Sequence, residues 1–519
     1  VYGKNDIEVM LGHEYYRAYG YALSAKRHNQ FSVNNKELAG AVVLDSGNSS
    51  SSEYNTESWL SRIMYNYDTR YFGSVSVMRQ ASSRFHQDSW WGTFWSVGGG
   101  WNIHRESWFK VPFVDELKFK ASYGENGNDG IGSYLYTPYY SIKNSSDNVS
   151  LTPASLGNKK ISWEKNGKFN MGFDFSLFKG RITGGIEYYS NMTKDMLSWV
   201  SLPPSFGWSG YYDNVGNMKN DGIEIDLHGD VIRTKDLTWN IYANVTSNHN
   251  EITKLSADCK KNYKEGIGLG YSSGSFFYKE GESRFTYYSK KYAGVNAETG
   301  ESMWYKNVYE TDANGKYIYY NNNNQVVDDN YEGSKHRKVV GQESTTTYSD
   351  ADYYLCGDVL PDFYGGFGTS VSWKGFDFSV DFQYQLGGQV YDGTYAGLMS
   401  SSAGSAIHVD MQNAWSADNK NSNIPRWQYG DSYMSSASDR FLISASYLTL
   451  SNITLGYTLP KSWLRSLGLQ SVRVYGVADN IWTWSKRQGL DPRQSITGSA
   501  SNAYYRPIRT VSGGITLTF

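Results

Sequence analysis

The chain has 519 residues, with 49 Lys and Arg against 51 Asp and Glu and a formal net charge of −2. This balance excludes the strongly basic field that nucleic-acid-binding proteins use. No run of 18 or more apolar residues occurs, which excludes a transmembrane helix but not β-barrel spans, because these are hidden in alternating segments of about ten residues.

Period-two alternation of apolar and polar side chains recurs along the chain and predicts about fourteen β-strands, each long enough to cross a membrane. In chain order they centre on residues 5–22, 55–67, 71–83, 92–104, 116–124, 163–177, 181–197, 218–231, 237–252, 363–373, 376–390, 444–459, 470–484 and 509–519. The frequent Tyr, Trp, Phe and Gly, with only 10 Pro, agree with β-structure. The apolar positions change from even to odd near Ser451 and Asn452, which predicts a β-bulge there.

The connections between these strands differ strongly in length. Short ones lie at 68–70, 179–180, 233–236 and 374–375, intermediate ones at 105–115 and 460–469, and long polar ones at 23–54, 125–162, 198–217, 253–362, 391–443 and 485–508. Short turns at one end and long loops at the other are typical of outer-membrane barrels. We therefore predict an all-β fold, a transmembrane antiparallel β-barrel with short periplasmic turns and long extracellular loops, and 253–362 as a large extracellular insertion. A soluble β-sandwich or propeller array is the alternative, but no repeat of about 40–50 residues is present.

The polar face of each strand is expected to line the lumen and the apolar face to contact lipid. The predicted lumen-facing charges are Arg62, Asp174, Glu224, Asp226, Asp377, Asp381 and Arg473. Because both signs are mixed, they do not form the one-sign ring of a simple ion-selective pore. We favour a structural role for them over contact with a substrate.

Aromatic residues in the long loops are the candidates for contact with a substrate or with a covering protein. They are Trp90, Trp91, Trp208, Tyr211, Tyr212, Trp415 and Trp427. Flat aromatic faces stack on sugar rings and on partner proteins. The alternative for each is the aromatic girdle at the membrane interface, or packing within the loops.

The sequence shows no catalytic constellation. No HExxH, CxxC or GxSxG motif occurs, so we expect no enzyme activity, no cofactor and no metal site. The stretch TDANGKY at 311–317 resembles half a calcium loop but fits better as a hairpin turn at Asn314 and Gly315, between 303–309 and 316–321. For Cys259 and Cys356, a disulfide and two free thiols both stay open.

Six stretches, ordered along nearly the whole chain, resemble the SusC/RagA family, the TonB-dependent outer-membrane transporters of Bacteroidetes. They lie at 82–103, 117–136, 214–227, 362–395, 445–460 and 472–493, and include SSRFHQDSWWGTFWSVGGGWNI and DFYGGFGTSVSWKGFDFSVDFQYQLGGQVYDGTY. The resemblance implies a barrel of about 22 strands with an N-terminal plug and a TonB-contacting segment. The lumen-facing charges would then face this plug as its polar partners. On this basis residues 1–519 are expected to be the C-terminal part of the barrel, without the plug and the first strands. A complete fourteen-stranded barrel is the competing interpretation.

The resemblance also implies a function: active import of an oligomeric nutrient, a glycan foremost, across the bacterial outer membrane. TonB would supply the energy through the plug, a SusD-like surface lipoprotein would cover the long loops, and another chain or a segment outside this sequence would supply the remaining strands. Alternatives are a peptide-importing member of the family, a passive fourteen-stranded diffusion channel and an extracellular lectin-like β-protein. The last strand ends on Phe519, which we expect to be an assembly signal for outer-membrane barrels, a girdle residue, or both.

Overall fold

The computed structural model describes residues 3–145, 148–202, 204–257, 259–260, 263–400, 404–464, 468–494, 498–500 and 507–519. Some residues of the predicted loop 125–162, and of each later long or intermediate loop, lie outside these ranges. The chain forms two compact units. Unit 1 comprises Val1–Trp101, Ala121–Phe169 and Met192–Asn217, and unit 2 comprises Asn102–Lys120, Asn170–Asn191 and Met218–Phe519. Within the described ranges, no helix is both long and apolar enough to cross a membrane.

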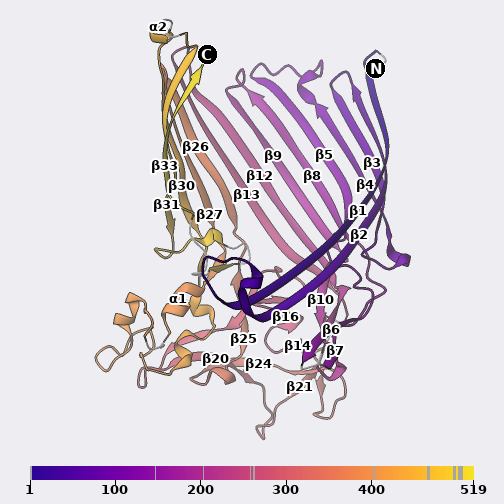
Figure 1. Ribbon diagram of the computed structural model, residues 1–519, viewed down its shortest axis with the longest axis vertical. Helices are drawn as coiled ribbons and strands as arrows, with labels where there is room; N and C mark the ends of the chain where they lie inside the picture. The colour runs from indigo at the N-terminus through magenta and orange to yellow at the C-terminus, as the bar shows by residue number, and fades with distance from the viewer. Residues whose placement is uncertain are drawn as a thin grey trace. The chain divides into compact units, whose positions relative to one another are not determined.

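The main element of the described chain is a sheet of fourteen strands (Figure 1). In hydrogen-bonded order these are β1(Asn5–Gln30), β2(Ala41–Tyr67), β3(Tyr71–Ser82), β4(Trp91–Asn102), β5(Val114–Asn128), β8(Glu164–Leu177), β9(Ile182–Lys194), β12(Gly216–Arg233), β13(Leu237–Leu255), β26(Phe363–Trp373), β27(Phe376–Leu386), β30(Tyr447–Thr458), β31(Ser471–Ser485) and β33(Thr510–Thr518). Each strand pairs with the next one of this sheet along the chain, and the pairs from β1 to β4 and from β13 to β33 are antiparallel. The fourteen predicted strands are confirmed in number and order.

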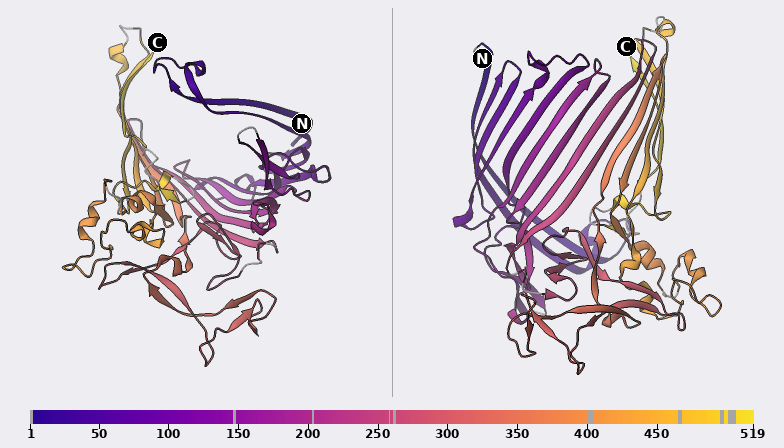
Figure 2. Two further views of the ribbon diagram at one scale, coloured as in Figure 1. Left: turned by 60° about the horizontal axis from the view of Figure 1, so that its bottom comes forward. Right: turned by 180° about the vertical axis from the view of Figure 1, so that it is seen from behind.

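The first two strands are much longer than predicted. β1 and β2 pair from Asn5 and Tyr67 to Gln30 and Ala41, so most of the predicted loop 23–54 is strand. β3 pairs with β2 only down to Thr56, and the β1–β2 ribbon therefore continues beyond the end of β3 (Figure 2). The prediction was wrong here because residues 46–53 are almost all Ser, Asn and Gly, which carry no hydrophobic alternation.

The bulge predicted in β30 is confirmed. Asp381 of β27 faces Asn452 and the next residue, Phe382, faces Leu450, so Ser451 is the extra residue. The pairing of β30 with β31 is also irregular here, because Leu450 faces Trp482 and Asn452 faces Asp479, which leaves one residue of β30 opposite two of β31. Inserting one residue reverses the parity, so the apolar side chains stay on one face on both sides of the bulge.

The apolar face of the sheet is exposed rather than buried. Ile223, Ile241 and Phe376 are 48%, 49% and 47% exposed, and Val511 near the end of the chain is 77% exposed. A soluble sheet would cover such a face, because large contiguous apolar surfaces are rare on soluble monomers. An exposed apolar face opposite a polar face is the arrangement expected of a lipid-contacting wall.

On the polar face, glycines let side chains of non-adjacent strands meet. Gly368 of β26 lies in register between Tyr242 of β13 and Asp381 of β27, and the Tyr242 hydroxyl donates a hydrogen bond to the Asp381 carboxylate. A Cβ atom at position 368 would lie 2.6 Å from the Tyr242 hydroxyl oxygen and 2.7 Å from Asp381 Oδ1. Only glycine leaves room for this bridge.

Gly456 of β30 has the same role in a bridge between β27 and β31. Arg473 donates two hydrogen bonds to Asp377, over 2.9 Å from Nε to Oδ1 and 2.5 Å from Nη2 to Oδ2. A Cβ atom at position 456 would lie 2.5 Å from Asp377 Oδ2 and 2.7 Å from Arg473 Nη2. The two predicted lumen charges are therefore one ion pair.

We expect Gly456→Ala to break the Asp377–Arg473 pair and to lower the free energy of unfolding by about 1–3 kcal/mol, because two charge-assisted hydrogen bonds on partly exposed side chains are lost. The matched control is Gly476→Ala in β31, where Ser512 O, at 3.9 Å, is the only atom of the described residues near an added Cβ. The measurement is the midpoint of the heat-induced mobility shift of the folded barrel in detergent. Equal midpoints for the two variants would contradict the prediction.

The long connections carry additional short elements. In unit 1 these are β6(Tyr139–Ser145) with β7(Asn148–Ser155), and β10(Leu197–Ser201) with β11(Gly210–Asn214). In unit 2, the connection from β13 to β26 contains β14(Tyr263–Lys264), β15(Gly268–Leu269), β16(Tyr271–Ser273), β17(Phe276–Tyr278), β18(Thr286–Lys290), β19(Tyr292–Val295), β20(Ser302–Tyr309), β21(Tyr319–Asn321), β22(Val326–Val327), β23(Lys335–Arg337), β24(Val339–Thr345) and β25(Tyr353–Asp358). The later connections contain α1(Gly393–Leu398), α2(Lys461–Leu464), β28(Gln389–Asp392), β29(Leu442–Ser444) and β32(Ser499–Ala500).

The turn predicted at Asn314 and Gly315 is present and closes a short hairpin, in which Thr311 pairs antiparallel with Tyr317 and the Ile318 N–H donates to Glu310 O over 3.1 Å. Gly315 has a φ of +78°, and the Asp312 N–H donates to Lys316 O over 2.8 Å. The flanking strands pair elsewhere, β20 with β24 and β21 with β23. Local turn chemistry was readable from the sequence, whereas strand partners were decided by tertiary packing. No disulfide joins Cys259 to Cys356, both of which are among the described residues.

Candidate functional site

A cavity of about 590 Å³ lies within unit 2, where the ends of β26, β27 and β30 meet the loops. Ligand-binding cavities commonly have volumes of about 300–1,000 Å³. The strands contribute Asn244, Tyr364, Gly366, Gln383 and Gln385, and the loops contribute Leu360, Gln389, Ala445 and Arg493, among others.

The strand register explains why polar groups face this cavity. Asn244 of β13, Gly366 of β26 and Gln383 of β27 are direct cross-strand neighbours, and Tyr364 faces Gln385. All of these positions share the face that carries Asp377 and Asp381, because side chains alternate along a strand. The cavity therefore opens on the polar, lumen-facing side of the sheet.

The loop side of the cavity contains an unsatisfied acceptor. Gln385 Nε2 donates to the backbone carbonyl of Ala445 over 3.3 Å, which anchors the strand to the loop. Gln389 Oε1 is buried and accepts no hydrogen bond from any described residue. A buried acceptor without a donor is costly, and Gln389 is the described residue of the cavity lining that carries one.

The cation at the cavity is neutralised by its neighbour. Arg493 donates two hydrogen bonds to Asp491, 2.8 Å from Nε to Oδ1 and 2.7 Å from Nη2 to Oδ2, and its guanidinium lies 5.7 Å from the centre of the Tyr447 ring. The lining thus offers amide and phenol donors and acceptors around a compensated charge. Such a set suits a neutral polar ligand, and both sugar hydroxyls and peptide groups match it.

A second, polar depression of about 380 Å³ lies on the same face of unit 2. It is lined by Asn170, Glu187, Tyr189, Asn191, Asn220, Glu224 and Asn248. Beside it, Lys120 Nζ lies 3.1 Å from Asp174 Oδ1 and 3.0 Å from Glu187 Oε2. Two predicted lumen charges, Glu224 and Asp226, form no ion pair with any described residue of the chain.

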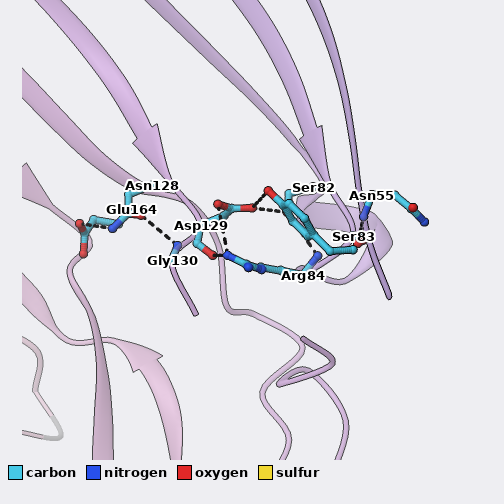
Figure 3. Close-up of polar contacts among 9 residues, drawn as sticks. Asn55, Ser82, Ser83, Arg84, Asn128, Asp129, Gly130 and Glu164 are labelled. Atoms are coloured by element: carbon cyan, nitrogen blue, oxygen red, sulfur yellow. Dashed lines mark hydrogen bonds and ion pairs between the residues drawn. The ribbon is translucent and has the colours of Figure 1, made fainter. Parts of the chain in front are cut away.

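In unit 1, a polar cluster fixes the loop 83–90 (Figure 3). The Asp129 carboxylate accepts hydrogen bonds from the Ser82 hydroxyl over 2.6 Å and from the Tyr54 hydroxyl over 2.8 Å. Arg84 Nη1 donates to the Asp129 carbonyl over 2.8 Å, and its guanidinium lies 4.2 Å from the centre of the Tyr54 ring. The loop base is thereby held rigidly against the strand ends.

The five predicted contact aromatics of unit 1 are partly engaged in packing. Trp90 Nε1 donates to Phe85 O over 2.8 Å, and the indole remains 42% exposed. Trp208 contacts Tyr140, with ring centres 5.4 Å apart, and Tyr212 contacts Trp199 at 5.2 Å. Tyr211 is half-buried and pairs in register with Val200, whereas Trp91 is 40% exposed and lies beneath Arg79.

In unit 2, the two predicted contact aromatics differ in their surroundings. Trp415 is half-buried, and its Nε1 donates to Ala297 O over 3.0 Å. Trp427 is 48% exposed and has no ring or hydrogen-bond contact with the described residues. Of the predicted set in this unit, Trp427 therefore offers the more accessible face. Their contact with a substrate stays a prediction.

Asn244, Gln383 and Gln385 fall on the polar face by strand alternation, but they were not predicted as a site. A cluster of amide residues at the loop ends of consecutive strands was the available signal. Gln389 and Arg493 lie in long loops, and only the tertiary structure brings them to these strand ends.

The comparisons with known proteins agree with this architecture. The chain is 31% identical to the TonB-dependent receptor SusC of Bacteroides thetaiotaomicron over 474 residues, 89% of this chain and 43% of the relative. It is 27% identical to the TonB-dependent receptor P3 of Formosa agariphila over 539 residues, 100% of this chain and 51% of the relative. The solved structure of the RagAB peptide transporter matches with a TM-score of 0.79 and 28% identity, over 99% of this chain and 54% of that chain. No family model matches.

The chain spans about half the length of the relatives it matches. The match extends over nearly all of this chain and includes the six stretches on which the resemblance was based. The all-β architecture and the exposed apolar face agree with an outer-membrane barrel. The chain belongs to the SusC/RagA family of TonB-dependent outer-membrane receptors.

Proposed function

We propose that the chain forms the barrel wall of a receptor that imports an oligomeric nutrient, a glycan foremost, by a TonB-dependent mechanism. The observation that carries the proposal is the lumen-side cavity of about 590 Å³ with its unsatisfied Gln389 Oε1. Its uncharged donors and acceptors and its tyrosine rings suit a hydroxyl-rich sugar chain. The alternative ligand is a peptide, favoured by the match to the RagAB peptide transporter.

The proposal includes partners of the barrel wall. A plug and further barrel strands, supplied by another chain or a segment outside this sequence, would complete the receptor, and a SusD-like lipoprotein would cover the long loops. The acidic groups of Glu224 and Asp226, which have no ion pair with the described residues, support a plug with basic side chains. TonB would then release the plug, whereas a passive diffusion channel would need neither TonB nor a plug.

We expect the double variant Gln385→Ala and Gln389→Ala to lower uptake at limiting substrate about tenfold. Two hydrogen bonds between the cavity and the bound substrate, of about 0.5–1.5 kcal/mol each, are lost. The measurement is uptake by cells of labelled oligosaccharides of glucose, fructose, mannose and galactose, and separately of labelled oligopeptides. The matched control is Gln342→Ala in β24, which is exposed and outside the cavity.

The outcomes separate the alternatives. Loss of oligosaccharide uptake on deletion of the gene and on deletion of TonB supports the glycan importer, and loss of oligopeptide uptake alone assigns the peptide alternative. Uptake that persists without TonB indicates a diffusion channel. Uptake that is unchanged in the double variant, with equal amounts of barrel in the membrane, contradicts the role of this cavity.

A further inference from the structure

The outward face of β1 to β4 in unit 1 is organised in rows, because facing residues of neighbouring strands are in direct register. At the short-turn end, Tyr71 of β3 faces Tyr67 of β2 and Trp101 of β4. The ring centres of neighbours in this row are 6.3 Å and 6.5 Å apart, and the rings are stacked. The next rows are largely apolar and contain Val9, Ile63, Val75 and Val97, then Leu11, Val77 and Trp95.

Tryptophans of three successive rows lie at the end of this apolar band towards the long loops. Arg79 of β3 faces Trp59 of β2 and Thr93 of β4. Trp91 and Trp95, two residues before and after Thr93, share its face of the sheet. Trp59, Trp91 and Trp95 are 55%, 40% and 42% exposed. Aromatic residues at both ends of an apolar band mark the two membrane interfaces.

Arg79 lies at the extracellular interface by its position along the strand. It is eight residues from Tyr71, which corresponds to about 27 Å along the strand. A strand tilted by about 40° converts this length to roughly 20 Å along the membrane normal, close to the height of about 25 Å for the apolar band. The long loops are extracellular, so Arg79 is at the level of the headgroups of the outer leaflet.

The guanidinium of Arg79 is held in place but not neutralised. It lies 5.4 Å from the centre of the Trp91 ring, and Nη1 donates to Thr93 Oγ1 over 3.3 Å. No carboxylate of the described residues forms an ion pair with it. By contrast, Arg17 on the same face pairs with Glu53 over 2.8 Å. Arginine has five N–H donors, so most donors of Arg79 are available on this exposed face.

We propose that Arg79, beside Trp91, binds a phosphate group of a phosphorylated glycolipid in the outer leaflet. A guanidinium recognises phosphate through paired hydrogen bonds, and indole rings settle at the level of lipid headgroups. The cation–π contact and the bond to Thr93 hold the guanidinium in position before the lipid binds. Trp91, a predicted substrate or lid contact, is thereby a lipid contact, and the site is independent of the proposed transport function.

The test measures lipid bound to the receptor purified from outer membranes. The receptor is delipidated in detergent and titrated with bis-phosphorylated lipid A, with enzymatically dephosphorylated lipid A and with inorganic phosphate, and bound molecules are counted by native mass spectrometry. We expect Arg79→Gln to weaken binding of bis-phosphorylated lipid A about tenfold and Arg79→Lys to weaken it less. The control is Arg17→Gln, which removes a cation already paired with a carboxylate.

Heat-modifiable gel mobility shows that each variant has formed the barrel, so a loss of binding is not a loss of folding. Selective binding of the phosphorylated lipid, lost with Arg79→Gln and kept with Arg17→Gln, supports the proposal. Equal binding of dephosphorylated lipid A, or unchanged binding by Arg79→Gln, overturns it and leaves an ordinary aromatic girdle. Competition by inorganic phosphate at concentrations similar to those of the lipid overturns the assignment to a lipid.

Discussion

Trp304→Ala is expected to open the joint between the two longest loop segments of unit 2 and to leave the strands of the main sheet intact. Trp304 of β20 is 1% exposed and is among the largest fully buried side chains of the described chain. Its ring centre lies 5.0 Å from that of Tyr348 and 5.8 Å from that of Tyr433, both in edge-on contact. Tyr348 belongs to the segment between β13 and β26, and Tyr433 to the segment between α1 and β29.

Replacing a buried tryptophan by alanine costs about 3–5 kcal/mol, because both the transfer free energy and the packing around the ring are lost. The lost free energy of stabilisation is confined to the loops, so the loops open locally before the barrel unfolds. Amide hydrogen exchange is the measurement, with faster exchange expected at 292–309 and 430–441 and unchanged exchange in β26 and β27.

The matched control for this prediction is Trp427→Ala, which removes a tryptophan of the same segment as Tyr433 that is 48% exposed. We expect its exchange pattern to equal that of the unmodified protein. If Trp304→Ala has the same pattern as the control, the two loop segments are held together by other contacts. The hydrogen bond from the backbone N–H of Tyr292 to Asp439 Oδ1, over 2.7 Å, would then be the next candidate for the contact that holds the two segments together.

Cys356 is expected to react with a thiol reagent at pH 8 about a thousandfold more slowly in the folded protein than in urea. Burial raises the pKa of the Cys356 thiol to about 12, and the nearby Asp439 carboxylate adds to the shift. Because the thiolate is the reactive form, its fraction at pH 8 falls from roughly a tenth or more to about 10⁻⁴. The Cys356 thiol is also directed to the carbonyls of Tyr354 and Ser289, with sulfur–oxygen distances of 3.4 Å and 3.6 Å.

The rate of labelling in a Cys259→Ser background measures this prediction, since Cys356 is then the single thiol. The rate should rise with pH without a plateau up to pH 10 in the folded protein, and should reach a plateau above about pH 9 in urea. Labelling of the folded protein within tenfold of the rate in urea would contradict the prediction. Combined with Trp304→Ala, the same thiol would report opening of the loops.

Much of the fold was predictable from the sequence because membrane strands obey one simple rule. Each strand exposes one face to lipid, so stretches such as 376–386 must alternate strictly, and the bulge at Ser451 was visible as a change of parity. The same rule fails outside the membrane. Residues 23–54 carry mostly small and polar side chains, and a loop was therefore predicted where β1 and β2 continue.

The candidate site was less predictable than the fold. Alternation assigned Asp377 and Arg473 to the polar face but contained no information on their pairing across Gly456, which depends on the stagger of three strands. The cavity residues Gln389 and Arg493 lie in long connections, whose backbone course follows from packing between distant segments rather than from a local period.

By itself, the sequence determined the all-β class, the number and order of the strands, the face that meets lipid and the resemblance to the SusC/RagA family. These features depend on local periodicity and on short motifs, and both can be recognised from consecutive residues. The tertiary structure alone decided the bridges over Gly368 and Gly456, the loop joint at Trp304 and the amide-lined cavity. Each of these depends on residues from several strands or loops, and their meeting is set by register and long-range packing.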